Sequence, residues 1–266
     1  MIFKWVLRIV GTCYVGLLVG APVGSVVFRA LRHGLAPAWD AVMTPAGVHA
    51  FVLTLEVAAV TVCLNTAFGI GMALVFARHR FRGVSLLEML IDLPLSISPV
   101  VVGLALLLCY SSTEGWLGPW LAHHGISVLF SFPGIVAASA FISLPYVVRE
   151  VHPVLVELGT EQEQAAETLG AGPWLVFFRI TLPAIRWGLA YGILLTTARV
   201  LGEFGAVSVV SGNIVGHTQT LTQFVDDQLT NFDPAGAYAG ALLLGVVCVL
   251  VLGALSFSRK REEQLR

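Results

Sequence analysis

The sequence predicts an all-α integral membrane protein with six transmembrane helices. Hydrophobic residues make up 57% of the 266-residue chain and charged residues only 12%, and the mean hydropathy is +0.86. A helix needs about 20 predominantly apolar residues to cross the hydrocarbon core of a bilayer. Runs of about this length or longer occur six times, at residues 9–28, 51–77, 84–110, 129–148, 187–211 and 235–257. We expect each run to form one transmembrane helix.

The first run follows Lys4 and Arg8, and a positively charged start is also typical of secretory signal peptides. The run is longer than the apolar region of such a peptide, and no A-x-A cleavage site closes it. We therefore expect this helix to remain in the protein. The second run contains Asn65, whose side-chain amide suits a hydrogen bond to a neighbouring transmembrane helix.

The third run contains a polar, proline-containing stretch about a third of the way along. Its members are Asp92, Pro94, Ser96, Ser98 and Pro99. Proline leaves backbone carbonyls without their helical partners, and serine hydroxyls can hydrogen-bond to those carbonyls. The stretch therefore predicts a hinge or kink. Whether Ser96 and Ser98 only support this hinge or also face a polar pathway through the membrane stays open.

Lysine and arginine residues fall mainly on one side of the six-span arrangement. That side holds Lys4, Arg8, Arg78, Arg80, Arg82, Arg149, Arg179, Arg186, Arg259, Lys260, Arg261 and Arg266. The opposite loops, residues 111–128 and 212–234, contain neither lysine nor arginine, and only Arg29 and Arg32 depart from the pattern. Because positive charge accumulates in cytoplasmic loops, we expect this side and both termini to be cytoplasmic.

The longest cytoplasmic loop, between the fourth and fifth runs, contains the stretch "TEQEQAAETLGAGP" at residues 160–173. Thr160 and Glu163 have the spacing of a capping box, which begins a helix. Gly170 and Gly172 can adopt the left-handed backbone that ends one, and Pro173 suits the first turn of a second. These signals predict a helix-turn-helix outside the bilayer. Two small residues on the first helix, Ala165 and Ala166, leave room for another protein's backbone and indicate a docking surface.

The same loop resembles the EAA motif, E-A-A-x3-G-x9-I-x-L-P, of permease subunits of ATP-binding cassette (ABC) importers. The positions that carry the resemblance are Gln164, Ala165, Ala166, Gly170, Ile180, Leu182 and Pro183. Gln164 stands where the family usually has glutamate. The resemblance implies the type I ABC importer permease fold, in which this segment is the coupling helix that sits in a groove of a cytoplasmic ATPase. It therefore marks these positions as ATPase-coupling residues.

Three further segments, residues 90–108, 115–126 and 198–221, resemble the W-type permease subunits of sulfate/thiosulfate importers. Molybdate permeases share the "GEFGA" element at residues 202–206. A molybdate or tungstate permease that works as a homodimer is therefore the alternative. A self-sufficient secondary transporter is a third possibility, but such transporters are typically built from internal repeats and would need no cytoplasmic docking helix. The chain shows no repeat and carries that helix.

The resemblance also implies partners and a location. It predicts a multi-pass protein of the bacterial inner membrane, with a second permease subunit of the T type, two ATPase subunits and a periplasmic sulfate-binding protein. ATP and Mg would be bound by the ATPase subunits. In this chain we expect no cofactor, no metal site and no catalytic residue. An ATPase site of the Walker A type is excluded because Lys4 and Lys260 are the only lysines and neither is followed by serine or threonine. The net charge of −1 also gives no basic surface for nucleic acid.

These considerations divide the chain into three parts. Residues 1–50 would form the first transmembrane helix and a periplasmic segment, and residues 51–258 would form the permease core with a coupling loop at 150–186. Residues 259–266 would be a cytoplasmic tail.

The fifth run contains two opposite charges, Arg199 and Glu203, one helical turn apart. A charged side chain in the middle of a bilayer is costly unless it is paired or faces water, so we expect these two to pair. Gly202 and Gly205 permit close helix contact or local unwinding beside the pair, and unwinding would expose backbone amides that can bind an anion. The pair either lines or gates an anion pathway or only fixes the helix against its neighbours.

Overall fold

A computed structural model describes residues 2–32 and 34–263, and the regular elements in these ranges are helices. They are α1 (Ile2–Val15), a π-helical turn η1 (Gly16–Gly20), α2 (Ala21–Leu31), α3 (Leu35–Val42), α4 (Pro45–Arg78), α5 (Val84–Ser96), α6 (Pro99–Tyr110), α7 (Gly118–His123), α8 (Phe132–Leu158), α9 (Glu161–Thr168), α10 (Pro173–Val176), a second π-helical turn η2 (Phe177–Thr181), α11 (Leu182–Leu201), α12 (Gly205–Ser211), α13 (Leu221–Thr230) and α14 (Pro234–Glu263). The prediction of an all-α fold is confirmed.

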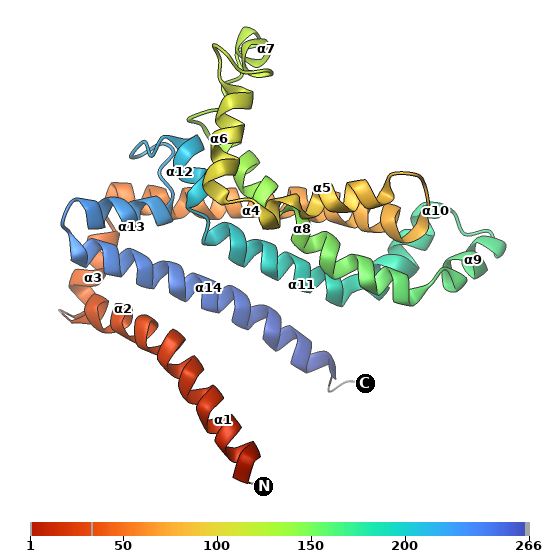
Figure 1. Ribbon diagram of the computed structural model, residues 1–266, viewed down its shortest axis with the longest axis horizontal. Helices are drawn as coiled ribbons and strands as arrows, with labels where there is room; N and C mark the ends of the chain where they lie inside the picture. Colours follow the sequence, from red (N-terminus) through yellow and green to blue (C-terminus); the bar gives the residue numbers. More distant parts are fainter. Residues whose placement is uncertain (1, 33, 264–266) are drawn as a thin grey trace.

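The body of the molecule is formed by α4, α8, α11 and α14, which lie side by side along its long axis (Figure 1). Small residues allow the first three of these helices to approach closely. A Cβ atom added to Gly69 of α4 would lie 2.6 Å from the Cβ atom of Val147 on α8, and one added to Gly192 of α11 would lie 2.8 Å from the Cα atom of the same valine. Such contacts are typical of helix packing in membranes. There the hydrophobic effect does not drive helices together, and small residues allow the close van der Waals packing that does.

Asn65 joins α4 to α8 in the middle of this body. Its Nδ2 atom donates to the carbonyl oxygen of Ala140 at 3.0 Å and to the hydroxyl of Ser143 at 2.8 Å. The prediction that this amide bonds to a neighbouring helix is confirmed. Asn65 and Ser143 are both buried, and this bond satisfies polar groups that burial would otherwise leave costly.

Four helical segments in the described ranges are long and apolar enough to cross a membrane: Val6–Leu31, Pro45–Arg78, Phe132–Leu158 and Pro234–Val251. Two more spans result if each of two bent helix pairs is counted as one. These pairs are α5 with α6, bent by 113°, and the segment Pro173–Leu201 with α12, bent by 57°. The six predicted runs therefore all correspond to helical segments. The third and fifth are broken, the third at the stretch where a hinge was predicted and the fifth beside Gly202 and Gly205.

The helices around the predicted coupling loop are longer than expected. The fourth apolar run was predicted to end at residue 148, but α8 continues to Leu158. The reason is packing, since Val151 and Leu155 on the extension are buried against Ile185 of α11. The non-helical connections of the loop are consequently confined to residues 159–172 on either side of α9.

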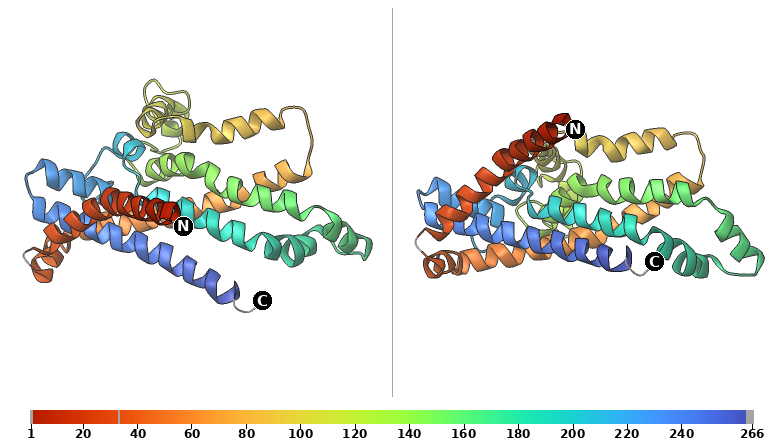
Figure 2. Two further views of the ribbon diagram at one scale, coloured as in Figure 1. Left: turned by 60° about the horizontal axis from the view of Figure 1, so that its bottom comes forward. Right: turned by 90° about the horizontal axis from the view of Figure 1, so that it is seen from below.

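The N-terminal helices stand apart from the body. Figures 1 and 2 show α1 diverging from α14, while α2 stays beside it. One contact at this end joins Arg29 Nη1 to the hydroxyl of Tyr238 on α14 at 3.0 Å. The segment Val6–Leu31 is almost entirely exposed in the isolated chain. Of the predicted tail, residues 259–263 continue α14, and residues 264–266 lie outside the described residues.

Candidate functional site

The predicted docking helix is observed as α9, and it lies at the tip of the molecule in all three views (Figures 1 and 2). It begins at Glu161, as predicted, and it contains no buried residue. Gly170 ends the turn after it with a φ angle of +86°, and Ala171 then donates its amide to the carbonyl oxygen of Ala166 at 3.0 Å. The prediction of a left-handed Gly170 is therefore confirmed. Gly172 has a φ angle of −73°, so the corresponding prediction for it was wrong.

The expected capping box of Thr160 and Glu163 is not formed. Thr160 makes no side-chain cap at the start of α9, and its hydroxyl instead accepts a hydrogen bond from Gln164 Nε2 at 3.2 Å. Glu163 turns towards Arg78, at the end of α4, and accepts two hydrogen bonds from it. A charge-assisted, two-pronged hydrogen bond to arginine is stronger than a hydrogen bond to one backbone amide. Glu163 therefore bonds to Arg78, and the capping box does not form.

The positions of the EAA-like motif separate into two groups. Gln164, Ala165 and Gly170 are exposed around α9, while Ala166 is partly covered. Ile180 and Leu182 are half-buried. Leu182 packs against the buried cluster of Ala73, Val147, Val151, Leu155 and Ile185, and Pro183 occupies the first turn of α11. The first group is therefore available to a partner, and the second holds the loop against the body.

An exposed apolar surface beside α9 was not identified from the sequence. Leu169 is 89% exposed and Trp174 is 75% exposed. The ring of Trp174 stacks on Phe178 with centroids 6.2 Å apart, and Phe178 is also exposed. We call α9 together with Leu169, Trp174 and Phe178 the docking end. Large exposed apolar side chains beside a helix without buried residues are typical of a protein–protein contact.

The predicted pair of Arg199 and Glu203 is present at the break between α11 and α12. Arg199 Nη1 lies 2.7 Å from Glu203 Oε2, and the two side chains are 29% and 2% exposed. Glu203 Oε1 accepts the backbone amide of Ala206, in the first turn of α12, at 3.0 Å. Arginine at the end of one helix and glutamate at the start of the next each complement the helix dipole there. The pair therefore joins the two helices across their break.

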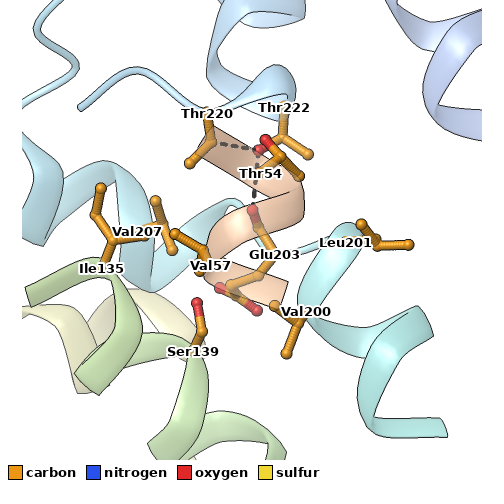
Figure 3. Close-up of a pocket in the computed structure, with 10 residues that line it drawn as sticks. All are labelled: Thr54, Val57, Ile135, Ser139, Val200, Leu201, Glu203, Val207, Thr220 and Thr222. Atoms are coloured by element: carbon orange, nitrogen blue, oxygen red, sulfur yellow. Dashed lines mark hydrogen bonds between the residues drawn. The ribbon is translucent and has the colours of Figure 1, made fainter. Parts of the chain in front are cut away.

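The other side of Glu203 faces a small cavity lined by both polar and apolar side chains (Figure 3). Its volume of about 10 Å³ leaves room for no more than about one water molecule. The lining residues are Thr54, Val57, Ile135, Ser139, Val200, Leu201, Glu203, Val207, Thr220 and Thr222. Thr222 donates its hydroxyl to the carbonyl oxygen of Glu203 at 2.9 Å. The cavity therefore surrounds Glu203 with hydroxyl groups from α4, α8 and the start of α13.

The two helix breaks lie against each other. A Cβ atom added to Gly205, at the start of α12, would lie 3.0 Å from the Cβ atom of Pro99, at the start of α6. Ser96 ends α5 and Ser98 immediately precedes α6, and both are exposed. The predicted hinge is thus confirmed as a sharp bend. Gly202, which directly follows α11, is exposed, and a Cβ atom added there would meet only the carbonyl oxygen of Ala198 in the same helix, at 3.6 Å, so it lies at the unwound turn rather than in a close contact with another helix.

A third ion pair connects residues that the sequence did not bring together. Arg149 on α8 donates from Nε and Nη2 to the two carboxylate oxygens of Asp92 on α5, at 2.8 and 2.9 Å. Because the two residues are 57 positions apart, no local spacing rule indicates this pair. It holds the first half of the third run against α8.

Most of the chain matches one protein-family model. Residues 65–263 match the model described as the binding-protein-dependent transport system inner membrane component. The chain belongs to this family. The assignment agrees with the resemblance seen in the EAA-like motif.

Several relatives with curated names are similar over most of this permease. The CysW sulfate transport system permease protein of Synechocystis is 46% identical over 94% of this chain and 90% of its own length. The CysW protein of Escherichia coli K12 is 40% identical over 98% of this chain and 89% of its own. The CysT sulfate transport permease of the same organism is 38% identical over 93% and 89%.

A solved structure has the same fold. It is a bacterial alginate ABC transporter in complex with a periplasmic protein that carries an alginate pentasaccharide. The match has a TM-score of 0.81 at 14% identity and covers 97% of this chain and 94% of the other. The type I ABC importer permease fold implied by the motif is therefore shown.

Proposed function

We propose that this chain is the transmembrane permease subunit of an ATP-driven importer that carries sulfate or thiosulfate across the inner membrane. The observation that carries the proposal is α9, an exposed helix with the spacing of the EAA motif, in a chain 40–48% identical to CysW sulfate permeases. Identity to the CysT permeases is lower, at 34–38%. This difference supports the W-type assignment, and the names of these relatives favour sulfate over molybdate.

The proposed importer contains three further kinds of protein. A T-type permease would form a heterodimer with this chain, and a periplasmic sulfate-binding protein would deliver the anion. Two ATPase subunits would bind ATP and Mg and contact the docking end. Support comes from the existence of both W- and T-type sulfate permeases in Escherichia coli and from the periplasmic protein bound to the related alginate transporter.

For translocation, we place the pathway or gate at the paired helix breaks, with Arg199, Gly202, Glu203, Gly205, Ser96 and Ser98. Arg199 is neutralised by Glu203 and therefore offers the anion no free positive charge. Hydroxyl groups and backbone amides at the breaks can instead bind a dianion by hydrogen bonds without a full opposite charge. Such weak, neutral binding suits a pathway from which the anion must leave again.

Uptake competition tests the proposed function. Cells that carry the complete complex and lack other sulfate uptake should accumulate labelled sulfate, and excess thiosulfate should reduce this uptake more than excess molybdate does. Molybdate uptake by this chain without a second permease would instead support the molybdate homodimer. Sulfate uptake that continues when the ATPase subunits are inactivated would support a secondary transporter.

Topology gives a second, independent prediction. Reporter fusions after Gly159 and at the C-terminus should report a cytoplasmic location, and a fusion after His123 should report a periplasmic one. The physical reason is that Lys and Arg gather at the loops around residues 79–82 and 159–186 and are absent from residues 111–128. A cytoplasmic signal at His123 would contradict the six-span arrangement.

A further inference from the structure

One side chain connects α9 to the body of the permease. Helix α9 has no buried residue, yet the carboxylate of Glu163 points inward and is only 14% exposed. In the ranges 2–32 and 34–263, the side-chain hydrogen bonds that join α9 to another helical element all end on Glu163. Glu163 therefore supplies the side-chain hydrogen bonds that position this helix against other helical elements.

Three elements converge on the ion pair that this carboxylate forms with Arg78. Arg78, at the end of α4, donates from Nε to Oε2 at 3.0 Å and from Nη2 to Oε1 at 3.1 Å. Its remaining Nη1 atom donates to the carbonyl oxygen of Leu155 on α8 at 3.1 Å. Thr181, which is buried at the end of η2, donates its hydroxyl to Glu163 Oε1 at 2.7 Å. The guanidinium and the carboxylate thus fix α9 relative to α4, α8 and η2 at once.

The environment makes this contact stronger than an ordinary surface ion pair. The two side chains are 13% and 14% exposed, so water screens them poorly. Paired, two-pronged hydrogen bonds between arginine and a carboxylate also fix orientation as well as distance. An exposed ion pair with one contact contributes little and would allow α9 to move freely.

We infer that the Arg78–Glu163 pair is the latch through which movement of a docked ATPase reaches the membrane helices. The inference rests on the proposed function of the docking end. Helix α4 continues from Arg78 for 34 residues, a length of about 50 Å, and near its other end Thr54 accepts the amide of Leu221 and lines the cavity of Glu203. A movement of Glu163 would therefore displace the Arg78 end of α4, and the far part of this helix, with Thr54, lines the cavity at the proposed gate.

The latch residues act by positioning and not by docking. Glu163 faces the body, whereas the docking end presents Ala165, Leu169 and Trp174 to the outside. Substitutions that remove the latch should consequently leave ATPase binding intact and interrupt the transfer of movement. This separation distinguishes the latch from the docking surface.

The test uses the complete complex with Glu163→Gln, Arg78→Gln and the double variant. Matched controls are Glu157→Gln, on α8 outside the docking end, and Arg80→Gln, which remove the same charges from nearby exposed positions. We expect the latch variants to retain co-purifying ATPase subunits and ATP hydrolysis, while sulfate taken up per ATP hydrolysed falls about tenfold. Arg78→Lys should lose less uptake per ATP than Arg78→Gln does, because the lysine ammonium keeps the positive charge but cannot form the two-pronged hydrogen bond to the carboxylate. The double variant should be no worse than either single one.

A second measurement does not depend on transport. After alanine replaces the four native cysteines, spin labels at Gln162→Cys on α9 and Val156→Cys on α8, both exposed, report the distance between the helices in the purified complex. We expect one narrow distance distribution with the latch and a broad one in Glu163→Gln. An unchanged distribution, normal uptake despite a broad one, or loss of the ATPase subunits from the variant would each overturn the latch. Failure of the unaltered complex to carry sulfate would instead refute the proposed function. The distance measurement would still show whether the Arg78–Glu163 pair fixes α9 relative to α8.

Discussion

Gly170→Val should abolish ATP-driven sulfate uptake and weaken co-purification of the ATPase, while insertion of the chain into the membrane stays near normal. Gly170 has a φ angle of +86°, and a β-branched residue is strained in this region by about 1–2 kcal/mol. No heavy atom lies within 4 Å of a Cβ added there, so the effect comes from the backbone and not from a clash. Helix α9 has no buried residue and is held to the body through Glu163, so we expect the strain to be relieved by tilting Ala165 and Ala166 away from their docking position.

Gly172→Val is the matched control for this prediction. Gly172 also has open space around it, but its backbone is extended, with φ −73° and ψ 161°, which valine adopts readily. Uptake and ATPase stoichiometry should therefore remain close to normal in Gly172→Val. Gln164→Glu, which restores the usual residue of the motif, should also be tolerated. A Gly170→Val complex with full ATPase content and normal uptake would refute the docking role of α9.

Features set by neighbours in the sequence were predictable, and the turn at Gly170 illustrates this. A glycine after a short helix and a proline three residues later are local signals, and the structure confirms both. The pair of Arg199 and Glu203 was predictable for the same reason, since residues one turn apart share a helical face. The glycines beside that pair, Gly202 and Gly205, left close helix contact and local unwinding both open, and the structure shows a break there.

Features set by distant parts of the chain were not predictable in the same way. The sequence indicated a kink at Pro94 and Pro99, but the 113° bend also depends on packing of α6 against α12, where Gly103 lies close to Ala206. Glu163 has a local capping partner in Thr160, yet it bonds to Arg78, which is 85 residues away. The local sequence around Glu163 does not indicate that a distant arginine will bind its carboxylate in place of the capping contact.

Glu203→Gln should cause loss of the assembled complex or of transport. The neutral amide keeps an oxygen for the amide of Ala206 but leaves Arg199 without its countercharge. Removing one partner of a buried ion pair typically costs about 3–5 kcal/mol, because the remaining charge is uncompensated. Glu114→Gln, in the exposed loop before α7, serves as the control and should have no effect.

The double variant Arg199→Gln/Glu203→Gln then decides between the structural and the gating role of the pair. Two glutamines one helical turn apart can hydrogen-bond to each other without charge. We therefore expect the second substitution to restore part of what the first removes, measured as the yield of assembled complex and as sulfate uptake. If both recover together, the pair acts by joining α11 to α12. Recovery of assembly without uptake would assign the charges to the gate. A double variant no better than Glu203→Gln in either measurement would show that the two side chains are not coupled, despite the 2.7 Å between them.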